Sequence, residues 1–271
     1  MARRSRIPIL CQVQTLEDAQ WVGTLRAQHP AVSTFVCNSQ FIARHCAVPG
    51  NQLSTVYHGY QPKALQRERR AGRLNPERLQ VGLLGRICES KGHYFVIKAA
   101  CKLKAQARIP IHFRFVGEAP TAEERTRVRR LVEEDGLADT IEFRGYRTEL
   151  AAEFAGMDLL VVPSQAEPFG RVFCEAAEAR VPVLLADSGG LGELSRRYDA
   201  GMRFTPGDEQ GFCDQLQVIA DSYGSVWAAF AVAGARMLRA LDFKAYLGVV
   251  NDLISCAASG RHISQDWLGN L

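Results

Sequence analysis

The chain has 271 residues, of which 47% are hydrophobic and 23% charged, and its formal net charge is +4 at pH 7. This length allows one large domain or two modest ones, and the apolar content is sufficient for a sizeable core. No apolar run approaches the ~18 residues of a transmembrane helix, and no basic stripe interleaved with aromatic residues indicates binding to nucleic acid.

The cysteines and the N-terminus both favour a cytoplasmic location. None of the eight cysteines has a partner at C-x-x-C spacing, so scattered reduced thiols are the simplest interpretation. The basic residues 1–6 precede only a short apolar run, residues 7–13, whereas a secretory signal needs a longer run and a small-residue cleavage site.

Basic residues are concentrated near the N-terminus. Residues 1–70 contain nine lysines and arginines against three acidic residues. Two interpretations remain open: the cations form a solvated surface and a basic linker, or they attract an anionic partner. An anionic partner would be an acidic acceptor or acidic lipid, which would place the protein peripherally at the inner membrane surface.

The first 61 residues predict a small α/β segment. Strands are expected at 7–13, 33–36 and 54–57, a helix at 15–28, and a second short helix capped by Asn38 and Ser39. This is too little for an independent Rossmann domain. Residues 62–78, which are rich in arginine and contain proline and glycine, are expected to form a linker.

Five short apolar runs after the linker predict buried strands separated by helices. The strands are expected at 79–84, 111–116, 140–143, 159–162 and 182–185, the intervening helices at 91–107, 121–134, 149–155 and 169–179, and a tail helix at 243–256. Continuous apolar strands that alternate with helices indicate a parallel sheet covered on both faces. The predicted fold class is therefore α/β, with a doubly wound Rossmann-like domain at 79–242 and a tail at 243–271.

Each predicted strand ends in a loop with glycine or polar residues. These loops are Gly85-Arg86, Gly117-Glu118, Gly145-Tyr146, the segment 164–170 and the segment 187–190. Because ligands of doubly wound sheets bind beyond the carboxyl ends of the strands, five such loops predict one cleft along that edge.

Two carboxylates, Glu167 and Glu175, stand eight residues apart after the fourth strand. Carboxylates accept hydrogen bonds from paired hydroxyls, which sugars and ribose present. Arg86 and Lys91, after the first strand, supply cations for a phosphate group near the start of a helix. The stretch from Glu167 to Glu175 resembles the E-x7-E signature of retaining GT-B glycosyltransferases, specifically glycosyltransferase family 4 (group 1).

Further motifs extend this resemblance from about residue 79 to about residue 195. Residues 81–92 resemble the family's "G-R-…-K-G" element, residues 143–146 its "F-x-G" strand end, and residues 182–193 its "P-V" and "G-G-x-x-E" elements. The turn at 115–118 departs from the family's "V-G-x-G" pattern, because the second glycine is missing.

The resemblance assigns roles to ten residues. It implies that Arg86 and Lys91 bind the donor diphosphate, that Glu167 contacts the donor sugar, and that Glu175 binds the ribose hydroxyls. Arg86, Lys91 and Glu167 are the expected catalytic residues, and the donor-binding set also includes Gly85, Gly117, Tyr146, Phe169, Gly170 and Arg171. Phe169 and Gly170 enter this set for backbone N–H groups that would face a sugar or phosphate oxygen.

The sequence has no D-x-D motif, and the family generally works without a bound metal. The resemblance therefore implies a retaining, metal-independent transfer with no cofactor other than the nucleotide sugar substrate. Among the histidines, His93 is a candidate to line the cleft. His58 is expected in a hinge turn, with assistance to a proton transfer as the alternative.

The resemblance also implies a two-lobed enzyme, of which residues 1–61 would be a remnant of the N-terminal acceptor lobe. We then expect a truncated lobe, a fragment, or one chain of a two-chain enzyme, with a dimer or a separate N-terminal lobe as partner. Apolar surface left along residues 7–60 and the tail helix would drive such association.

The expected function is transfer of a hexose-type sugar from a UDP- or GDP-linked donor to a glycan or lipid-linked acceptor, as in polysaccharide or lipopolysaccharide biosynthesis. The alternatives are a non-catalytic nucleotide-sugar binding module, the donor half of a two-chain enzyme, or another GT-B enzyme such as an epimerase or phosphorylase. A dehydrogenase is disfavoured because no G-x-G-x-x-G follows a strand. The sequence leaves the base, the sugar and the acceptor open.

Overall fold

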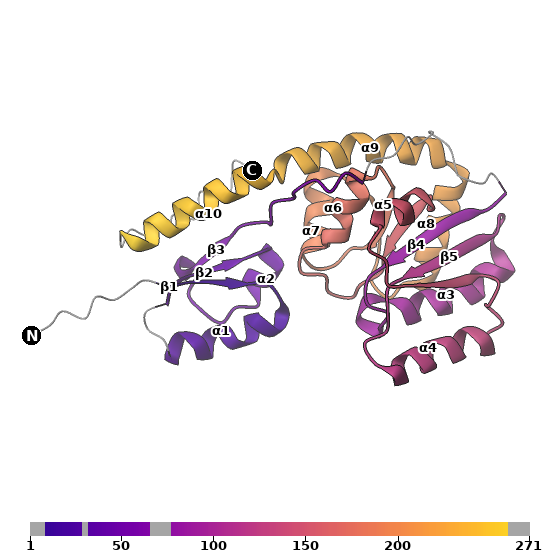
Figure 1. Ribbon diagram of the computed structural model, residues 1–271, viewed down its shortest axis with the longest axis horizontal. Helices are drawn as coiled ribbons and strands as arrows, with labels where there is room; N and C mark the ends of the chain where they lie inside the picture. The colour runs from indigo at the N-terminus through magenta and orange to yellow at the C-terminus, as the bar shows by residue number, and fades with distance from the viewer. Residues whose placement is uncertain (1–8, 29–31, 66–76, 260–271) are drawn as a thin grey trace, which may run out of the picture. The chain divides into compact units, whose positions relative to one another are not determined.

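The computed structural model describes residues 9–28, 32–65 and 77–259 (Figure 1). The chain forms two compact units, a smaller one made of Met1–Gln61 with Arg239–Leu271, and a larger one made of Pro62–Leu238. Residues 66–76 of the expected linker lie outside the described residues, as do six of the nine basic residues near the N-terminus, namely Arg3, Arg4, Arg6, Arg67, Arg69 and Arg70.

The larger unit is built on a six-stranded parallel sheet with the strand order β6-β5-β4-β7-β8-β9. The strands are β4 (Leu79–Leu84), β5 (Ile111–Val116), β6 (Ile141–Gly145), β7 (Leu159–Val162), β8 (Val183–Ala186) and β9 (Met202–Phe204). Their order reverses between β4 and β7, which is where ligands of doubly wound sheets bind. This confirms the predicted doubly wound α/β fold.

Helices cover both faces of this sheet. They are α3 (His93–Gln106), α4 (Ala122–Glu134), α5 (Leu150–Ala155), α6 (Arg171–Glu178), α7 (Gly189–Tyr198), α8 (Glu209–Asp221) and α9 (Tyr223–Ala240). Figure 1 shows α3 and α4 on one face and α5 and α6 on the other. The α3 face buries one continuous core that includes Phe113, Phe115 and Phe212.

Local sequence explains where the helices begin and why the strands are apolar. Thr121 caps α4 by accepting a hydrogen bond from the N–H of Glu124, and Asp208 caps α8 by accepting one from the N–H of Gly211. All four residues of β7 and of β8 are buried, as expected for central strands covered by helices on both sides.

The predicted boundaries are confirmed for β4, β5 and β7, and those of the other two predicted strands shift by one or two residues. The structure corrects the start of two helices, because α3 begins at His93 and α6 at Arg171. In both cases a glycine with positive φ, Gly92 (81°) or Gly170 (84°), directly precedes the helix. The sequence analysis did not predict β9, α7, α8 or α9.

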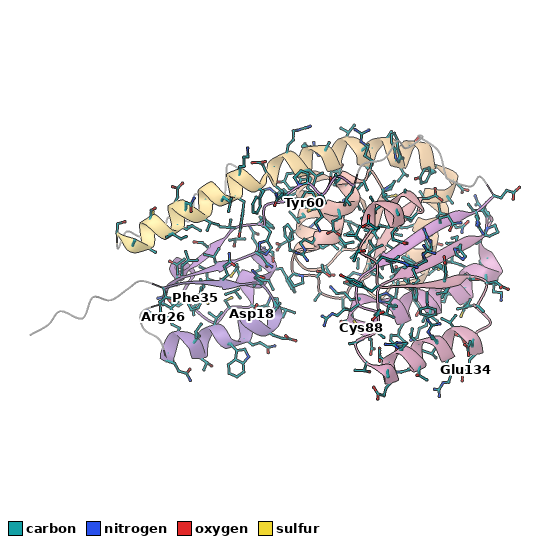
Figure 2. The ribbon with its side chains drawn as sticks, viewed as in Figure 1. Asp18, Arg26, Phe35, Tyr60, Cys88 and Glu134 are labelled. Atoms are coloured by element: carbon teal, nitrogen blue, oxygen red, sulfur yellow. The ribbon has the colours of Figure 1, made fainter. Side chains whose placement is uncertain are left out.

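The smaller unit contains a three-stranded parallel sheet of β1 (Ile9–Val13), β2 (Val32–Cys37) and β3 (Leu53–Thr55), in that order. Its helices are α1 (Leu16–Gln28), α2 (Gln40–Arg44) and α10 (Phe243–Ala258), with a 3₁₀ turn η1 (Gly50–Gln52). Ser39 caps α2 as expected, since its hydroxyl accepts from the N–H of Ile42. Phe35, labelled in Figure 2, is fully buried in the core of this unit.

Within the described ranges, no single helix is long and apolar enough to cross a membrane. The consecutive helices α8 and α9 meet that criterion only as a pair, and they are bent by 98° at their junction.

Candidate functional site

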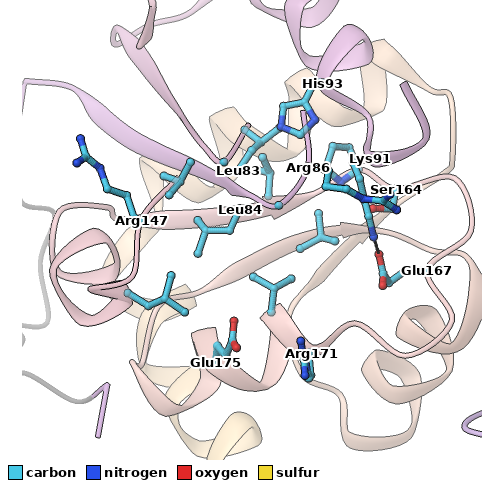
Figure 3. A pocket seen from close by; sticks show the side chains of 18 of the residues that line it. Leu83, Leu84, Arg86, Lys91, His93, Arg147, Ser164, Glu167, Arg171 and Glu175 are labelled. Carbon is cyan, nitrogen blue, oxygen red and sulfur yellow. Dashed lines mark hydrogen bonds and ion pairs between the residues drawn. The ribbon is translucent and has the colours of Figure 1, made fainter. Parts of the chain in front are cut away.

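A cavity of about 600 Å³ opens at the point where the strand order of the larger unit reverses (Figure 3). Its walls come from the loops after β4, β5, β6 and β7 and from α6. The polar and glycine residues that line it are Lys63, Gly85, Arg86, Lys91, His93, Gly117, Glu118, Tyr146, Arg147, Ser164, Glu167, Arg171 and Glu175.

Glycine is required where the loops after β4 and β5 meet. Gly117 has a φ of 146°, and a Cβ added there would lie 1.9 Å from the carbonyl oxygen of Gly85. The N–H of Gly85 donates to the carbonyl of Val116, and the N–H of Gly117 donates to that of Gly145. The three strand ends are therefore tied together, and they carry Arg86 and Tyr146 at fixed positions beside the cavity.

Lys91 ends a 3₁₀ turn, η2 (Glu89–Lys91), instead of opening helix α3 as the sequence predicted. The next residue, Gly92, has left-handed backbone geometry, and a Cβ there would lie 2.6 Å from Pro163 at the end of β7. The turn is thus packed against the neighbouring strand end. Its position brings Lys91 Nζ to 2.6 Å from Glu167 Oε2 (Figure 3).

The start of α7 holds the loop that contains Glu167. Gly189 has a φ of 61°, and a Cβ there would lie 2.4 Å from the carbonyl oxygen of Glu167. The N–H of Leu191 donates to that same carbonyl, and the hydroxyl of Ser188 donates to the carbonyl of Ser164. Because the backbone is supported on this side, the Glu167 carboxylate points into the cavity with only 15% of its side chain exposed.

Glu175 lies on α6, one turn after Arg171, and only 8% of the residue is exposed. Its Oε1 accepts from Lys63 Nζ at 2.5 Å. Glu178, one turn further along α6, accepts from the backbone N–H groups of Lys63 and Leu65. The buried position of Glu175 fits its apolar sequence neighbourhood.

His93 opens α3 and lines the cavity, as the sequence analysis suggested, although only 1% of the residue is exposed. Its ring meets the ring of Phe115 edge-on, with the centroids 4.8 Å apart. Neither ring nitrogen has a hydrogen-bond partner among the residues that the structure describes. Burial, assisted by the charge of Lys91, lowers the pKa of His93 to about 4.

Eight of the ten predicted site residues line this cavity, and Phe169 and Gly170 do not. Phe169 is 5% exposed, and Gly170 is the residue before α6, packed against Leu191. The sequence analysis missed Lys63, which it assigned to the linker, and Arg147. The position of Arg147 directly after Tyr146 is a signal that would have found it.

Positive charge exceeds negative charge around the cavity. Five cations line it (Lys63, Arg86, Lys91, Arg147 and Arg171), against three carboxylates (Glu118, Glu167 and Glu175). Each of two carboxylates, Glu167 and Glu175, is paired with a lysine. The arrangement is suited to a ligand that carries both a multiply charged anion and hydroxyl groups.

The fold is shared with solved glycosyltransferase structures. The chain superimposes on HepE from Anabaena with a TM-score of 0.77 at 20% identity, covering 92% of this chain and 72% of HepE. For sucrose-phosphate synthase from Thermosynechococcus elongatus the TM-score is 0.71 at 21% identity, covering 90% of this chain and 66% of that protein. These neighbours define a GT-B fold.

Residues 78–222, more than half of the chain, match the family model described as "Glycosyl transferases group 1". The chain belongs to this family. It is 27% identical over 140 residues, 51% of this chain, to the lipopolysaccharide core biosynthesis glycosyltransferase LpsE of Rhizobium meliloti (strain 1021). It is 33% identical over 159 residues, 56% of this chain, to D-inositol 3-phosphate glycosyltransferase of Mycobacterium marinum (strain ATCC BAA-535 / M).

These two matches span 39% and 33% of the relatives' own lengths. The chain therefore covers well under half of each of these curated relatives.

Proposed function

We propose that the chain binds the nucleoside diphosphate sugar of a retaining, metal-independent hexosyltransferase of family 4, and that it carries the catalytic groups for transfer. The observation that carries this proposal is the placement of Glu167, Glu175 and five cations around one cavity at the reversal of the strand order. A nucleotide sugar presents a diphosphate, a ribose and a sugar, and this site offers a partner for each.

Glu175 is proposed to bind the ribose hydroxyls. Its carboxylate is buried on α6 and accepts hydrogen bonds toward the cavity. Arg86, Lys91 and Arg171 are proposed to bind the diphosphate, because cations fixed by short turns meet that charge with little reorganisation. Glu167, at the end of the β7 loop, is proposed to accept from the hydroxyls of the donor sugar.

In the transfer step, the bond between the sugar and the diphosphate breaks and negative charge grows on the leaving diphosphate. Arg86 and Lys91 would stabilise that charge, since preorganised cations in a partly buried site interact strongly with it. The proposal assigns this role to side chains of the chain itself, so it includes neither a metal ion nor a cofactor.

Relatives support the identity of the donor and the acceptor only by analogy. HepE has been crystallised with UDP and with UDP-glucose, which favours a uridine or guanosine diphosphate hexose here. The name of LpsE places that relative in lipopolysaccharide core biosynthesis. We accordingly propose a glycan or lipid-linked acceptor, with the smaller unit as part of the acceptor side. We further propose that the protein works in the cytoplasm or peripherally at the inner membrane surface.

One observation favours a second candidate function, a nucleotide-sugar binding module or the donor half of a two-chain enzyme. Every residue that lines the cavity belongs to the larger unit. This unit therefore contains a complete set of donor contacts, and nucleotide binding does not require that the same chain also carries the acceptor site. The second candidate predicts binding without transfer, and a dimer or a separate N-terminal lobe would then complete the enzyme.

The proposed function is tested by calorimetric titration of UDP, GDP and ADP and of their common sugar conjugates. We expect one nucleotide to bind, and Arg86→Ala and Glu175→Ala to weaken it. Arg108→Ala is the control, because Arg108 forms an exposed ion pair with Asp221 and is not among the residues that line the cavity. Binding that survives both cavity substitutions would refute the assignment of the site.

A transfer assay then separates the two candidates. With the nucleotide sugar that binds best, transfer that is lost in Glu167→Ala supports the enzyme. Tight binding with no transfer, in the presence of polysaccharide and lipid-linked acceptors, supports the binding module or the two-chain enzyme.

A further inference from the structure

Lys63 occupies the carboxylate that the proposed function assigns to ribose. Its Nζ lies 2.5 Å from Glu175 Oε1, and its side chain lines the cavity. The residue comes from the segment before β4, outside every motif at the strand ends. Its partner lies 112 residues further along the chain.

The backbone of this segment is held independently of the Lys63 side chain. The N–H of Lys63 donates to both carboxylate oxygens of Glu178, at 3.1 and 2.9 Å, and the N–H of Leu65 donates to Oε1 at 3.1 Å. Glu178 is only 4% exposed. A buried carboxylate thus fixes the backbone at Lys63 and Leu65 to α6, while the ammonium group reaches Glu175 at the end of a flexible four-carbon chain.

The ion pair itself is easily exchanged. The Lys63 side chain is 44% exposed, whereas that of Glu175 is 10% exposed. Half-exposed ion pairs contribute little net stability because water and salt screen them. A ribose presents two neighbouring hydroxyls, which offer the carboxylate two hydrogen bonds in place of one.

We propose that Lys63 is a displaceable cation that holds Glu175 in the empty site, and that the ribose of the nucleotide must displace it. This inference rests on the proposed function, because it requires a nucleotide whose ribose meets Glu175. The Glu178 anchor keeps the backbone in place during the exchange, so only the Lys63 side chain has to move. Lys63 is therefore a positioning residue that lowers nucleotide affinity by competing for Glu175.

A different role would give the opposite result. If Lys63 bound the diphosphate, its removal would weaken nucleotide binding regardless of the ribose. The two roles are separated by measuring what the ribose hydroxyls contribute to affinity, which is the Kd of a 2′,3′-dideoxynucleoside diphosphate divided by the Kd of the ordinary nucleoside diphosphate. Any general effect of the lost charge on the diphosphate cancels in this ratio.

The experiment titrates UDP, GDP and their 2′,3′-dideoxy forms into the full chain and into Lys63→Met, with Lys63→Gln as a second variant in case the first folds poorly. We expect the ratio to rise about three- to fivefold in Lys63→Met, the range expected for a half-exposed ion pair. Lys102→Met is the matched control, because Lys102 is 42% exposed, pairs with Glu209 at 2.7 Å and is not among the residues that line the cavity. Its ratio should equal that of the unmodified chain.

A ratio that stays constant or falls in Lys63→Met overturns the displacement, while nucleotide binding by the unmodified chain leaves the proposed function standing. If neither the unmodified chain nor the variant binds UDP or GDP, both the displacement and the proposed function are wrong. Binding that appears only after Lys63 is replaced supports both.

Discussion

Two lysine–glutamate pairs lie in the same cavity, and they differ in the kind of sequence that supplies the lysine. Lys91 and Glu167 both come from loops at the carboxyl ends of neighbouring strands, β4 and β7. Lys63 comes from the segment before the sheet and reaches Glu175 on α6. The N–O distances, 2.6 and 2.5 Å, are nearly the same, so the difference lies in what holds each lysine in place.

Lys91 is held by the strand ends themselves, because Gly92 packs directly on Pro163 after β7. Lys63 is held through Glu178, a carboxylate of the same helix that carries its partner Glu175. The first lysine is thus part of the binding surface, whereas the second is a side chain that a ligand can replace. An ion pair in a binding site acquires its role from the backbone beneath it rather than from its length.

The largest effect is expected where both pairs lose their common frame. Gly117→Ala places a Cβ against the Gly85 carbonyl in a backbone with positive φ, so the loop that carries Arg86 has to move. We expect a loss of about 4 kcal/mol in unfolding free energy, combining strain and overpacking, and no measurable UDP or GDP binding. Chemical denaturation and calorimetry measure the two effects.

Gly248→Ala is the control for this substitution. Gly248 lies inside α10 with open space around its Cβ position, so alanine should be neutral or stabilise by up to about 1 kcal/mol. If Gly117→Ala is tolerated as well as Gly248→Ala, the strand ends are not the rigid support that the comparison of the two pairs requires.

Much of this frame was predictable from the sequence, because it depends on local patterns. The continuous apolar runs at β4, β5 and β7 gave the right boundaries, since central parallel strands are buried on both faces. The loops that follow them were then expected at one edge of the sheet. Arg86 and Glu175 line the cavity as a consequence of that topology.

What the sequence did not predict depends on contacts between distant residues. Lys63 is joined to Glu175 only by the folded chain, and no spacing or motif marks it. Strand β9 has three residues, too few for a periodic signal. The predicted start of α6 was early because nothing local shows that Gly170 adopts a left-handed conformation before the helix.

A second prediction concerns His93, which lies beside Lys91 and distinguishes that pair from the other. The pKa of His93 is about 4 in the folded chain, mainly because of burial, against an ordinary value near 6.5. Between these values the unfolded chain binds the proton more readily, so the contribution to stability is complete above about pH 6.5 and is lost as the pH falls toward 4. The full change is on the order of 3 kcal/mol.

His93→Phe removes this titration and keeps an aromatic ring beside Phe115. We expect the difference in unfolding free energy between the unmodified chain and His93→Phe to change by that amount between pH 7 and pH 4, measured by denaturant unfolding at several pH values. His112→Asn is the comparison, because burial also lowers the pKa of that half-buried histidine. If the two substitutions change the profile equally, His93 has no special place under the Lys91 pair.

The last prediction compares the two lysines directly in catalysis. Lys91→Met should lower kcat/KM for sugar transfer by about 100-fold, a loss of about 2.7 kcal/mol in transition-state stabilisation, because a fixed cation is removed from the leaving diphosphate. Lys63→Met should change kcat/KM by less than about fivefold, because the side chain has already left Glu175 when the donor is bound. Lys91→Arg should recover part of the loss, since it restores the charge but not the shape. Equal losses at the two positions would mean that both lysines act on the bound donor, and the distinction drawn from their backbone supports would be wrong.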